Sequence, residues 1–481
     1  MAPTDALFWY AESALPIFRP IIAGLYILDR PPDRQAIKAG CEAAMTMVGR
    51  LRQRVVETPL HIGLPEWVDD PHFDEAYHLR YLSVPAPGTM RDLLDLVAAL
   101  FATPLDRERP LWEAYVIDGL EGQRAAYFFK MHHSLVDGVG SIALLNILTQ
   151  RARHQPIPHV QARRRKSAQQ TGGLAALQRL AVDNVRAATR IAGDAATLPL
   201  QLVTRPREVL GQISGIVRGL RGVIADAGSG IVHDPLTRST SGLSRRLDVM
   251  EVPLDRLCAI KASLKVTIND VVLAALTGAL REYHRERRIK IDHLNCMVPM
   301  SLRGRDERDV LGNRVGMFNI VLPLGEKRPR RRLERIVAQT RRAKSDGRSS
   351  LFPFLVQTLT MLPGAVFGWL ARQSLERVNV ACTNIPGVRE RRYMAGAEVV
   401  AIHPFASVVQ GTPIVVALLS YGEMMEIGID TDPEAIPDPH RIAELFDAAL
   451  DELETTGSPV RRRQSETKWR DSSTATSTSR T

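Results

Sequence analysis

The chain has 481 residues, of which 45% are hydrophobic and 24% charged, so it has the balance of a globular protein and enough length for two domains. Its net charge is +10, but it contains no zinc-finger or RNA-binding signature and only 5% aromatic residues, so we expect no nucleic-acid partner. The cysteines are far apart in the sequence, so neither a metal site nor a disulfide framework is expected; they are Cys41, Cys258, Cys296 and Cys382.

The N-terminus does not resemble a leader sequence. Asp5 and Glu12 interrupt its apolar residues and no basic segment precedes them, which predicts a cytoplasmic protein without a signal peptide. The most membrane-like stretch, residues 351–370, is interrupted by prolines, a glycine and polar side chains. We therefore expect a core helix or helix pair there and not a membrane span.

The first half, residues 1–150, reads as alternating strands and helices. Strands are expected at Gly24–Leu28, Trp112–Ile117 and Ala125–Met131, because each is a short apolar run. Apolar residues then recur at helical spacing after Gly138. The segment from His132 to Gly138 therefore lies on a strand-to-helix turn.

This turn carries the residues best suited to moving a proton. Side chains alternate along a strand, so His132 and His133 should point to opposite sides and only one can act as a base. The residues alone leave open which of the two it is. Asp137 either orients the base or pairs with an arginine elsewhere, and Gly138 allows the turn. The alternative is a buried histidine pair with a helix N-cap aspartate.

Residues 151–240 form a basic connector without strong strands. Its segments 174–192 and 209–224 show apolar residues at helical spacing, which suits packing on the protein or contact with a bilayer. Basic runs occur at 163–166, at 328 and 330–332, and at 461–463. We expect them to serve solubility or a peripheral contact with a membrane or lipid-body surface.

The second half, residues 241–456, again mixes strands and helices, and a Ser, Thr and Arg-rich tail at 457–481 is expected to be disordered. Strands are predicted at Arg246–Val252, Asn295–Val298, Met317–Leu322, Val378–Cys382, Glu398–Ile402 and Ile414–Tyr421. Thr267 and Asp270 have the spacing of an N-cap and N3 residue before a helical run. Capping alone explains them, although a helix N-terminus also offers N–H groups to an oxyanion or phosphate.

Two sequence blocks carry a family resemblance. His132–Gly138 resembles the HHxxxDG motif of acyl-CoA-dependent acyltransferases with the chloramphenicol acetyltransferase fold. Pro104–Glu113 resembles the PLDRxRPLWE block of the bacterial wax ester synthase/diacylglycerol acyltransferases within that superfamily. Further blocks agree in order over about the first 455 residues: Thr4–Trp9, Trp67–Asp70 with Phe73, Asp74 and His78, Pro85–Gly88, Asn269–Asp270, Pro299–Arg303, Gly312–Asn313 and Thr383–Gly387.

The resemblance implies an α/β fold of two chloramphenicol-acetyltransferase-like domains, each a mixed sheet flanked by helices, with the active site in a tunnel between them. It implies direct transfer of a long-chain acyl group from acyl-CoA to diacylglycerol, with acyl-CoA as co-substrate and no bound cofactor or metal. On this mechanism His133 is the general base, and we leave His132 a supporting role in packing with a structural hydrogen bond. Six second-half residues are implied to bind substrate or support the site: Asn269, Asp270, Arg303, Asn313, Thr383 and Asn384.

Three alternatives stay open. A long-chain fatty alcohol as acceptor would give a wax ester. Transfer onto a trehalose or polyketide lipid uses the same motif, but the block Pro104–Glu113 argues against it. A non-catalytic lipid-binding protein on the same fold is disfavoured by His133, Asp137 and Gly138 together. The chain also departs from the family at residues 17–22, which bears on acyl-chain or acceptor preference, and at Thr383, where serine is common.

Overall fold

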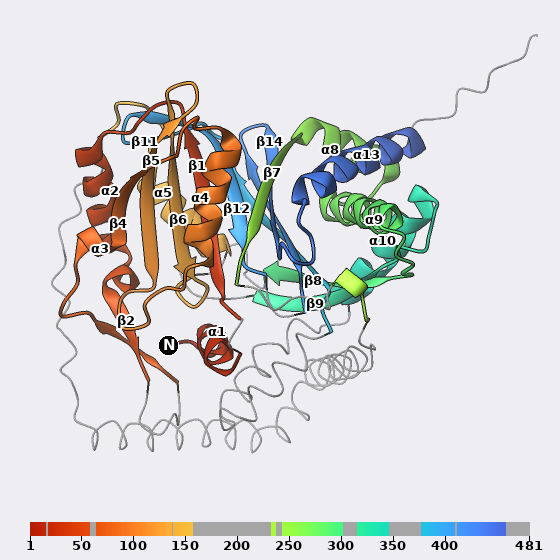
Figure 1. Ribbon diagram of the computed structural model, residues 1–481, viewed down its shortest axis with the longest axis horizontal. Coiled ribbons are helices and arrows are strands. Elements are labelled where there is room, and N and C mark those ends of the chain that lie inside the picture. The colour runs from red at the N-terminus through yellow and green to blue at the C-terminus, as the bar shows by residue number, and fades with distance from the viewer. Residues whose placement is uncertain are drawn as a thin grey trace, which may run out of the picture.

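The computed structural model describes residues 1–15, 18–57, 64–136, 138–156, 232–236, 243–301, 315–345, 377–408 and 411–457. Two sheet-rich bodies lie side by side, and each is built around a six-stranded sheet with helices packed against it (Figure 1). The mixed α/β architecture with two halves is therefore confirmed. Asp137, Arg303, Asn313, the connector from 157, the stretch 351–370 and the tail from 458 lie outside the described residues.

The N-terminal sheet has the order β11-β12-β1-β6-β5-β4. Its strands are β1 (Ile21–Leu28), β4 (Leu79–Ser83), β5 (Trp112–Leu120), β6 (Arg124–His132), β11 (Arg392–Met394) and β12 (Ala397–Ala406). It is accompanied by α1 (Pro3–Ala14), α2 (Arg34–Met47), η1 (Gly49–Arg52), α3 (Glu75–His78), α4 (Met90–Ala102), α5 (Gly138–Leu148) and the hairpin of β2 (Gln53–Val56) and β3 (Glu66–Asp69). Because β12 pairs antiparallel with β1, the late part of the chain completes the sheet of the early part.

The C-terminal sheet has the order β7-β14-β13-β10-β8-β9. Its strands are β7 (Arg246–Pro253), β8 (Leu294–Ser301), β9 (Val315–Leu322), β10 (Val380–Val388), β13 (Ile414–Tyr421) and β14 (Met424–Thr431). Its helices are α8 (Leu254–Leu264), α9 (Ile268–Glu286), α10 (Pro329–Ser345) and α13 (Pro439–Gly457). All six strands expected in the second half are present, with shifted ends at most of them, and β14 was not predicted.

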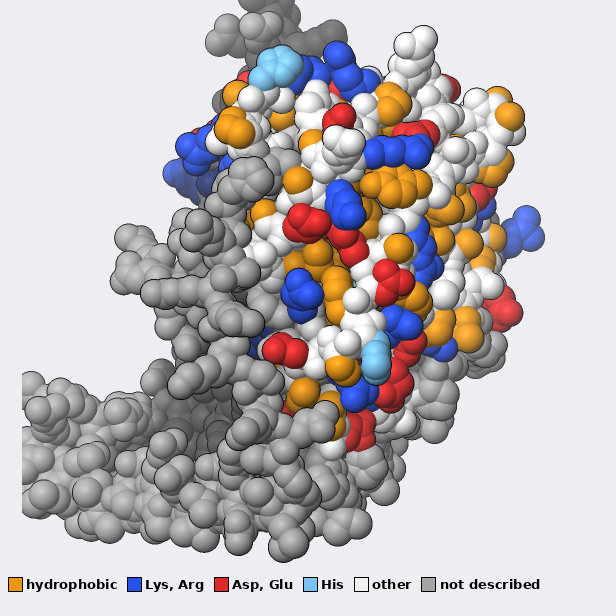
Figure 2. Space-filling model, turned by 90° about the vertical axis from the view of Figure 1, so that its left-hand side faces the viewer, with side chains coloured by type: hydrophobic (Ala, Val, Ile, Leu, Met, Phe, Trp, Pro, Cys, Tyr) orange, Lys and Arg blue, Asp and Glu red, His pale blue; other side chains and the backbone are white. Residues whose placement is uncertain are grey.

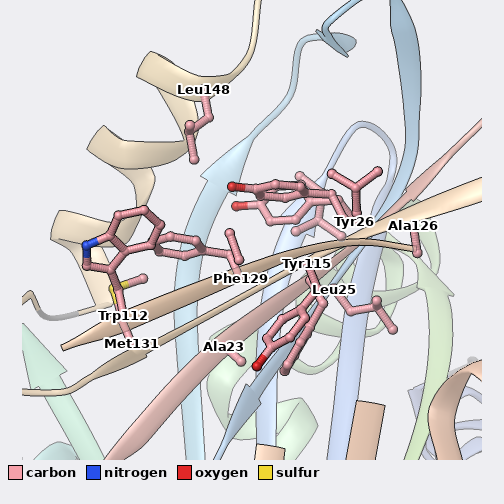
Figure 3. Packing of buried hydrophobic residues seen from close by; sticks show 14 of the residues in the cluster. Ala23, Leu25, Tyr26, Trp112, Tyr115, Ala126, Phe129, Met131 and Leu148 are labelled. Atoms are coloured by element: carbon pink, nitrogen blue, oxygen red, sulfur yellow. The ribbon is translucent and has the colours of Figure 1, made fainter. Parts of the chain in front are cut away.

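Local sequence explains where the helices start and which faces they bury. Thr89 and Asp92 form a capping box at α4, and Thr267 and Asp270 form one at α9, as the spacing predicted. Strand alternation then sends aromatic side chains of the N-terminal sheet into a shared core. Figure 3 shows part of this core, with Leu148 projecting from α5 toward the strands.

The two sheets meet where β12 leaves the C-terminal half. This strand packs on β13 and β14, and the approach is so close that a Cβ on Gly428 would lie 1.9 Å from the carbonyl oxygen of Pro404. Only glycine fits at that position. The Arg91 side chain of α4 also donates to the carbonyl oxygen of Leu247 at 2.8 Å, and Arg246 pairs with Asp95 at 2.9 Å. These contacts hold the two halves against each other.

The described surface carries mixed charges. On the face with α2 and α3, basic and acidic side chains are interspersed (Figure 2), as in the pair of Lys38 and Glu75 at 3.5 Å. In the basic stretch at 328 and 330–332, Arg332 is buried and pairs with Glu452 at 2.6 Å, which ties α10 to α13. Part of that stretch therefore serves packing. None of the described helices combines the length and apolar character required to cross a bilayer.

Candidate active site

The end of β6 separates the two histidines. His132 is 1% exposed and does not line the large apolar cavity beside this turn, whereas His133 is half-buried and lines it. This cavity has a volume of about 240 Å³. Its walls come from both halves of the chain, because β6 and α5 face β8, β10, β12 and β13 across it.

His132 is contacted at both ring nitrogens. The backbone N–H of Ser134 donates to its Nδ1 at 3.1 Å, and the hydroxyl oxygen of Ser134 lies 2.7 Å from the same atom. A nitrogen that accepts a backbone N–H carries no proton, so the proton of the neutral ring belongs on Nε2. That atom lies 3.4 Å from Oε2 of Glu12. His132 is therefore held between the turn and α1.

Glu12 is a charged residue of α1 that the sequence did not assign to the site. Burial disfavours its ionised form, but His132, Arg107 and Arg19 more than offset this, so the pKa of Glu12 lies below its ordinary value. Arg107 also stacks over Trp9 at 3.6 Å from the ring centre. The family-like block Pro104–Glu113 therefore clamps α1 next to the histidines.

The turn itself is fixed by backbone contacts and one buried ion pair. The N–H of His133 donates to the carbonyl oxygen of Pro20 at 2.7 Å, at the entrance to β1. Arg50 donates to the carbonyl oxygen of Leu135 at 3.1 Å and pairs with the fully buried Asp5 at the same distance. The Phe8 ring of α1 then stacks on the His133 ring, with 4.0 Å between centroids and 14° between planes. Helix α1 thus fixes the position of the imidazole from one side.

The cavity lining is almost entirely apolar. Among the described lining residues, His133 and Tyr26 are the only titratable side chains, and burial raises the pKa of Tyr26 far above neutrality. The uncharged polar residues in the wall are Ser141, Thr383, Asn384, Ser407 and Thr412. His133 is therefore the one described side chain in this wall that can exchange a proton near neutral pH.

The departures from the family pattern also reach the cavity. Phe18, Pro20, Ile21 and Ile22 contribute to its wall, and Pro16 and Ile17 lie outside the described residues. Thr383 lines the wall from β10. The pairing of β10 with β13 shifts register between Ile385 and Val388. Gly387 lies in this irregular segment, where a Cβ would come within 1.9 Å of the carbonyl oxygen of Ser420, so only glycine fits there.

The second-half candidates divide into two groups. Asn384 lines the cavity, and its side-chain amide donates to Oδ1 of Asn269 at 2.5 Å, which joins β10 to the N-terminus of α9. Asp270 does not line the cavity, because one carboxylate oxygen caps α9 and the other accepts from the Thr340 hydroxyl at 2.7 Å. Asp270 thus holds α9 to α10 and fixes Asn269 beside it.

The described residues offer poor nucleophiles near His133. Ser134 is fully buried and bonded to His132, outside the cavity wall. Burial raises the pKa of the Cys41 and Cys382 thiols to about 12 and that of Cys296 well above its usual range, so these thiols stay protonated. Ser134 and these thiols are therefore not candidates to carry a covalent acyl group in the wall, whose described hydroxyl side chains are Ser141, Thr383, Ser407 and Thr412.

Sequence reasoning missed the buried charges that support β6. Lys130, one residue before Met131, is fully buried, pairs with Glu113 at 2.9 Å and donates to the carbonyl oxygens of Leu100 and Thr103. Tyr115 donates to the same Glu113 carboxylate. A lysine and a glutamate inside two otherwise apolar strands were the available signal, since such residues are buried only when paired.

Comparison with known proteins gives a consistent result. The family model "Wax ester synthase/diacylglycerol acyltransferase catalytic domain" matches residues 1–272, and the "WS/DGAT C-terminal domain" matches residues 311–454. A putative diacylglycerol O-acyltransferase of Mycobacterium tuberculosis is 32% identical over 94% of this chain and 99% of its own. The probable diacylglycerol O-acyltransferase tgs1 of the same species is 29% identical over 93% of this chain and 94% of its own.

Solved structures share the fold. A wax ester synthase/diacylglycerol acyltransferase from Marinobacter aquaeolei VT8 has a TM-score of 0.64 at 24% identity, covering 95% of this chain and 99% of its own. The starter condensation domain of rhizomide synthetase, in complex with C8-CoA and Leu-SNAC, has a TM-score of 0.59 at 11% identity, covering 95% and 94%. With the family model matching more than half of its length, this chain belongs to the wax ester synthase/diacylglycerol acyltransferase family and is an acyltransferase.

Proposed function

We propose that this protein transfers a long-chain acyl group from acyl-CoA to diacylglycerol, forming triacylglycerol, with His133 as the general base. One observation carries the proposal: His133 is the only imidazole among the described side chains that line the cavity. The wall around it is apolar and comes from both halves. Such a wall suits acyl chains, and a single imidazole suits the removal of one hydroxyl proton.

The chemistry needs one proton to move twice. His133 takes the proton of the acceptor hydroxyl as the oxygen attacks the thioester carbonyl carbon, so a C–O bond forms and a tetrahedral oxyanion develops. When the C–S bond breaks, the protonated imidazole returns the proton to the CoA sulfur. Polar groups of the wall, among them Thr383 and Asn384, are proposed to support the reacting groups.

We propose direct transfer, which needs no acyl-enzyme; the described wall hydroxyls of Ser141, Thr383, Ser407 and Thr412 are the candidates that a labelling experiment must test. Ser134, the serine nearest to the base in sequence, is buried against His132 and does not line the cavity. The buried thiols Cys41, Cys296 and Cys382 are held protonated by their raised pKa values. Both substrates must then occupy the site together.

The substrates are proposed from the relatives. The condensation domain that shares the fold holds C8-CoA, which supports an acyl-CoA donor in the corresponding body of this chain. The relatives in Mycobacterium are named diacylglycerol O-acyltransferases, which favours diacylglycerol, while the family name also includes wax ester synthases. A long-chain fatty alcohol is therefore the second acceptor to test.

The place of action is proposed from the acceptor. Diacylglycerol resides in membranes and lipid bodies, so the enzyme would meet it at such a surface from the cytoplasmic side. Flotation of purified protein with anionic or neutral vesicles measures this directly. Sedimentation of the protein away from both kinds of vesicle would contradict it.

The test is thiol release from palmitoyl-CoA by purified protein offered either diacylglycerol or hexadecanol, with lipid products separated and His133→Ala assayed beside the wild type. We expect acceptor-dependent release with triacylglycerol as main product and loss of release in the variant. If wax ester were the main product, the proposed acceptor would change from diacylglycerol to a fatty alcohol, and the proposed mechanism would stay the same. Full activity of a folded His133→Ala protein would overturn the base assignment.

Labelled acyl-CoA without acceptor tests direct transfer. The protein should carry no covalent label after denaturation, and label should appear in lipid only once acceptor is added. Stoichiometric label on the protein would replace direct transfer with an acyl-enzyme, and mapping the labelled peptide would show which residue carries it.

A further inference from the structure

Three acid and imidazole groups meet at the junction of the two sheets, away from the cavity. His403 lies on β12, Glu426 on β14 and Glu251 on β7. One ligand atom from each lies within 4.8 Å of the others. His403 and Glu426 are 2% and 1% exposed, whereas Glu251 is exposed. His403 and Glu426 thus form the buried part of the cluster, and Glu251 is its solvent-exposed member.

The buried members of this cluster are not satisfied by hydrogen bonds. Nδ1 of His403 and Oε2 of Glu426 face each other as an ion pair at 3.1 Å, and beyond this pair neither atom has a hydrogen-bond partner among the described residues. A buried polar atom that lacks such a partner costs free energy. Two such atoms facing the same point are better explained by a ligand that both contact.

The charges point to a cation as that ligand. Glu251 is the direct cross-strand neighbour of Glu426, and like charges in that position destabilise a sheet. With a neutral imidazole the three groups carry two negative charges, which one divalent cation would balance.

A second buried histidine shows what a complete ion pair looks like in the same half. His284 has Nδ1 at 2.6 Å from the carbonyl oxygen of Leu280 and Nε2 at 3.2 Å from Asp234. Both of its ring nitrogens are therefore in hydrogen bonds. His403 and Glu426 differ because, among the described residues, their facing atoms have only each other.

We propose that Glu251, His403 and Glu426 bind one divalent metal ion that fastens β12 to β14 and β7. Atoms that each lie about 2.0–2.2 Å from one ion are about 3–3.5 Å apart at tetrahedral or octahedral angles, which the facing atoms of His403 and Glu426 match. The exposed Glu251 side chain can turn to complete the set. One nitrogen and two carboxylates suit Zn²⁺ first and Mn²⁺ second, because imidazole suits the former and carboxylates also suit the latter.

The position of the ion gives it a structural effect. The neighbours of His403 on β12, Ile402 and Pro404, both line the cavity. A metal at His403 would therefore hold the strand that forms the wall between the two sheets. This role does not depend on the proposed reaction, so the two proposals can fail separately.

The experiment uses full-length protein without a histidine tag, stripped with EDTA and then dialysed. Zn²⁺ and Mn²⁺ binding are measured by calorimetry, and the melting temperature is recorded with and without each ion. We expect one high-affinity Zn²⁺ per chain and a melting temperature raised by a few degrees, because an ion that binds only the folded state stabilises it. Absence of a stoichiometric site for either ion in the wild type would overturn the proposal.

Two variants and one control make the test specific. Glu426→Gln and Glu251→Gln should each weaken Zn²⁺ binding by at least about tenfold. Glu251 is exposed, so its variant keeps the fold even if Glu426→Gln does not. His284→Gln removes another buried imidazole of the same half and should bind Zn²⁺ like the wild type. Unchanged affinity in Glu251→Gln, or loss of the site in folded His284→Gln, would contradict the assignment.

Discussion

The two halves contribute different chemistry to one cavity. The N-terminal half supplies an imidazole, His133, which stacks on Phe8, while Glu12 and Arg50 lie outside the wall and fix the adjacent His132 and turn. The C-terminal half supplies uncharged groups, chiefly Thr383 and Asn384. Under the proposed mechanism this difference is a division of labour, in which one half moves the proton and the other shapes the site and supports the reacting groups.

The largest expected effect separates the two neighbouring histidines. His133→Gln should lower kcat/KM by about 10²–10⁴-fold with little change in stability, because it removes the base from a half-buried position. His132→Gln should instead cost about 1–3 kcal/mol of stability, because Ser134 and Glu12 lose their buried partner. Steady-state kinetics and urea unfolding of both variants measure this, and the reverse ranking would break the comparison.

The buried pair under the histidines should matter nearly as much, but for folding. Lys130→Met leaves Glu113 buried without its main cation and should destabilise the protein by about 3–5 kcal/mol. The double variant Lys130→Met/Glu113→Gln should recover part of that loss. Arg330→Met is the matched control, since its pair with Glu334 is exposed and should be worth less than about 1 kcal/mol. Equal unfolding free energies for Lys130→Met and Arg330→Met would contradict the network.

On the C-terminal side, Asn384→Ala should reduce kcat/KM by roughly tenfold, because it removes the bridge to Asn269 at about 1–2 kcal/mol. The pH dependence of the rate should stay that of the wild type, since no proton carrier is lost. Thr340→Val is the control outside the cavity, and it should lower stability by releasing Asp270 without changing kcat/KM. An altered pH profile in Asn384→Ala would contradict the claim that the C-terminal half takes no part in proton transfer.

Glu12 should make the support of His132 pH-dependent. Its folded-state pKa is below the ordinary value of 4.5, so its stabilising contribution is present above that pH and is lost as the pH falls through the folded pKa. The stability difference between wild type and Glu12→Gln should therefore be constant above about pH 5.5 and shrink in acid. Urea unfolding at pH 6 and in acid measures this, and a difference that grows in acid would have the wrong sign.

The smallest effect is expected from Thr383→Ser, which restores the residue common in the family. It removes one methyl group, worth about 0.8 kcal/mol, so kcat/KM should change by no more than about fourfold. Thr383→Val removes the hydroxyl at similar volume and should have the larger effect. Equal kinetics for the serine and valine variants would show that the hydroxyl plays no part.

The fold was predictable where sequence pattern and structure have the same period. Buried strands such as β6 and β13 read as apolar runs, and the capping box at α9 was visible from Thr267 and Asp270. Strand β14 was missed because Glu426, Gly428 and Asp430 face the crossing strand and interrupt its apolar pattern. Where a strand packs against another strand that crosses it, it can require polar residues and glycine, and in the sequence these residues resemble a loop.

The site was predictable only in part. The two histidines and Asn384 were found through a motif and a family resemblance. The contacts of Phe8 with His133 and Glu12 with His132 join residues more than a hundred positions apart, which no local pattern reveals. The pairing of β12 with β1 joins residues that are even farther apart in the sequence. The domain limits at 150 and 241 stay predictions that do not include this exchange of strands.

The most direct test of the central claim is the pH dependence of a single turnover. Acyl transfer from palmitoyl-CoA to diacylglycerol would be followed at saturating substrate for the wild type and His133→Ala over about pH 5–9, where an imidazole titrates. We expect the wild-type rate to rise through one ionisation to a plateau, and the variant to be slow and without that step. The same ionisation in the rate of the variant would show that another group carries the proton.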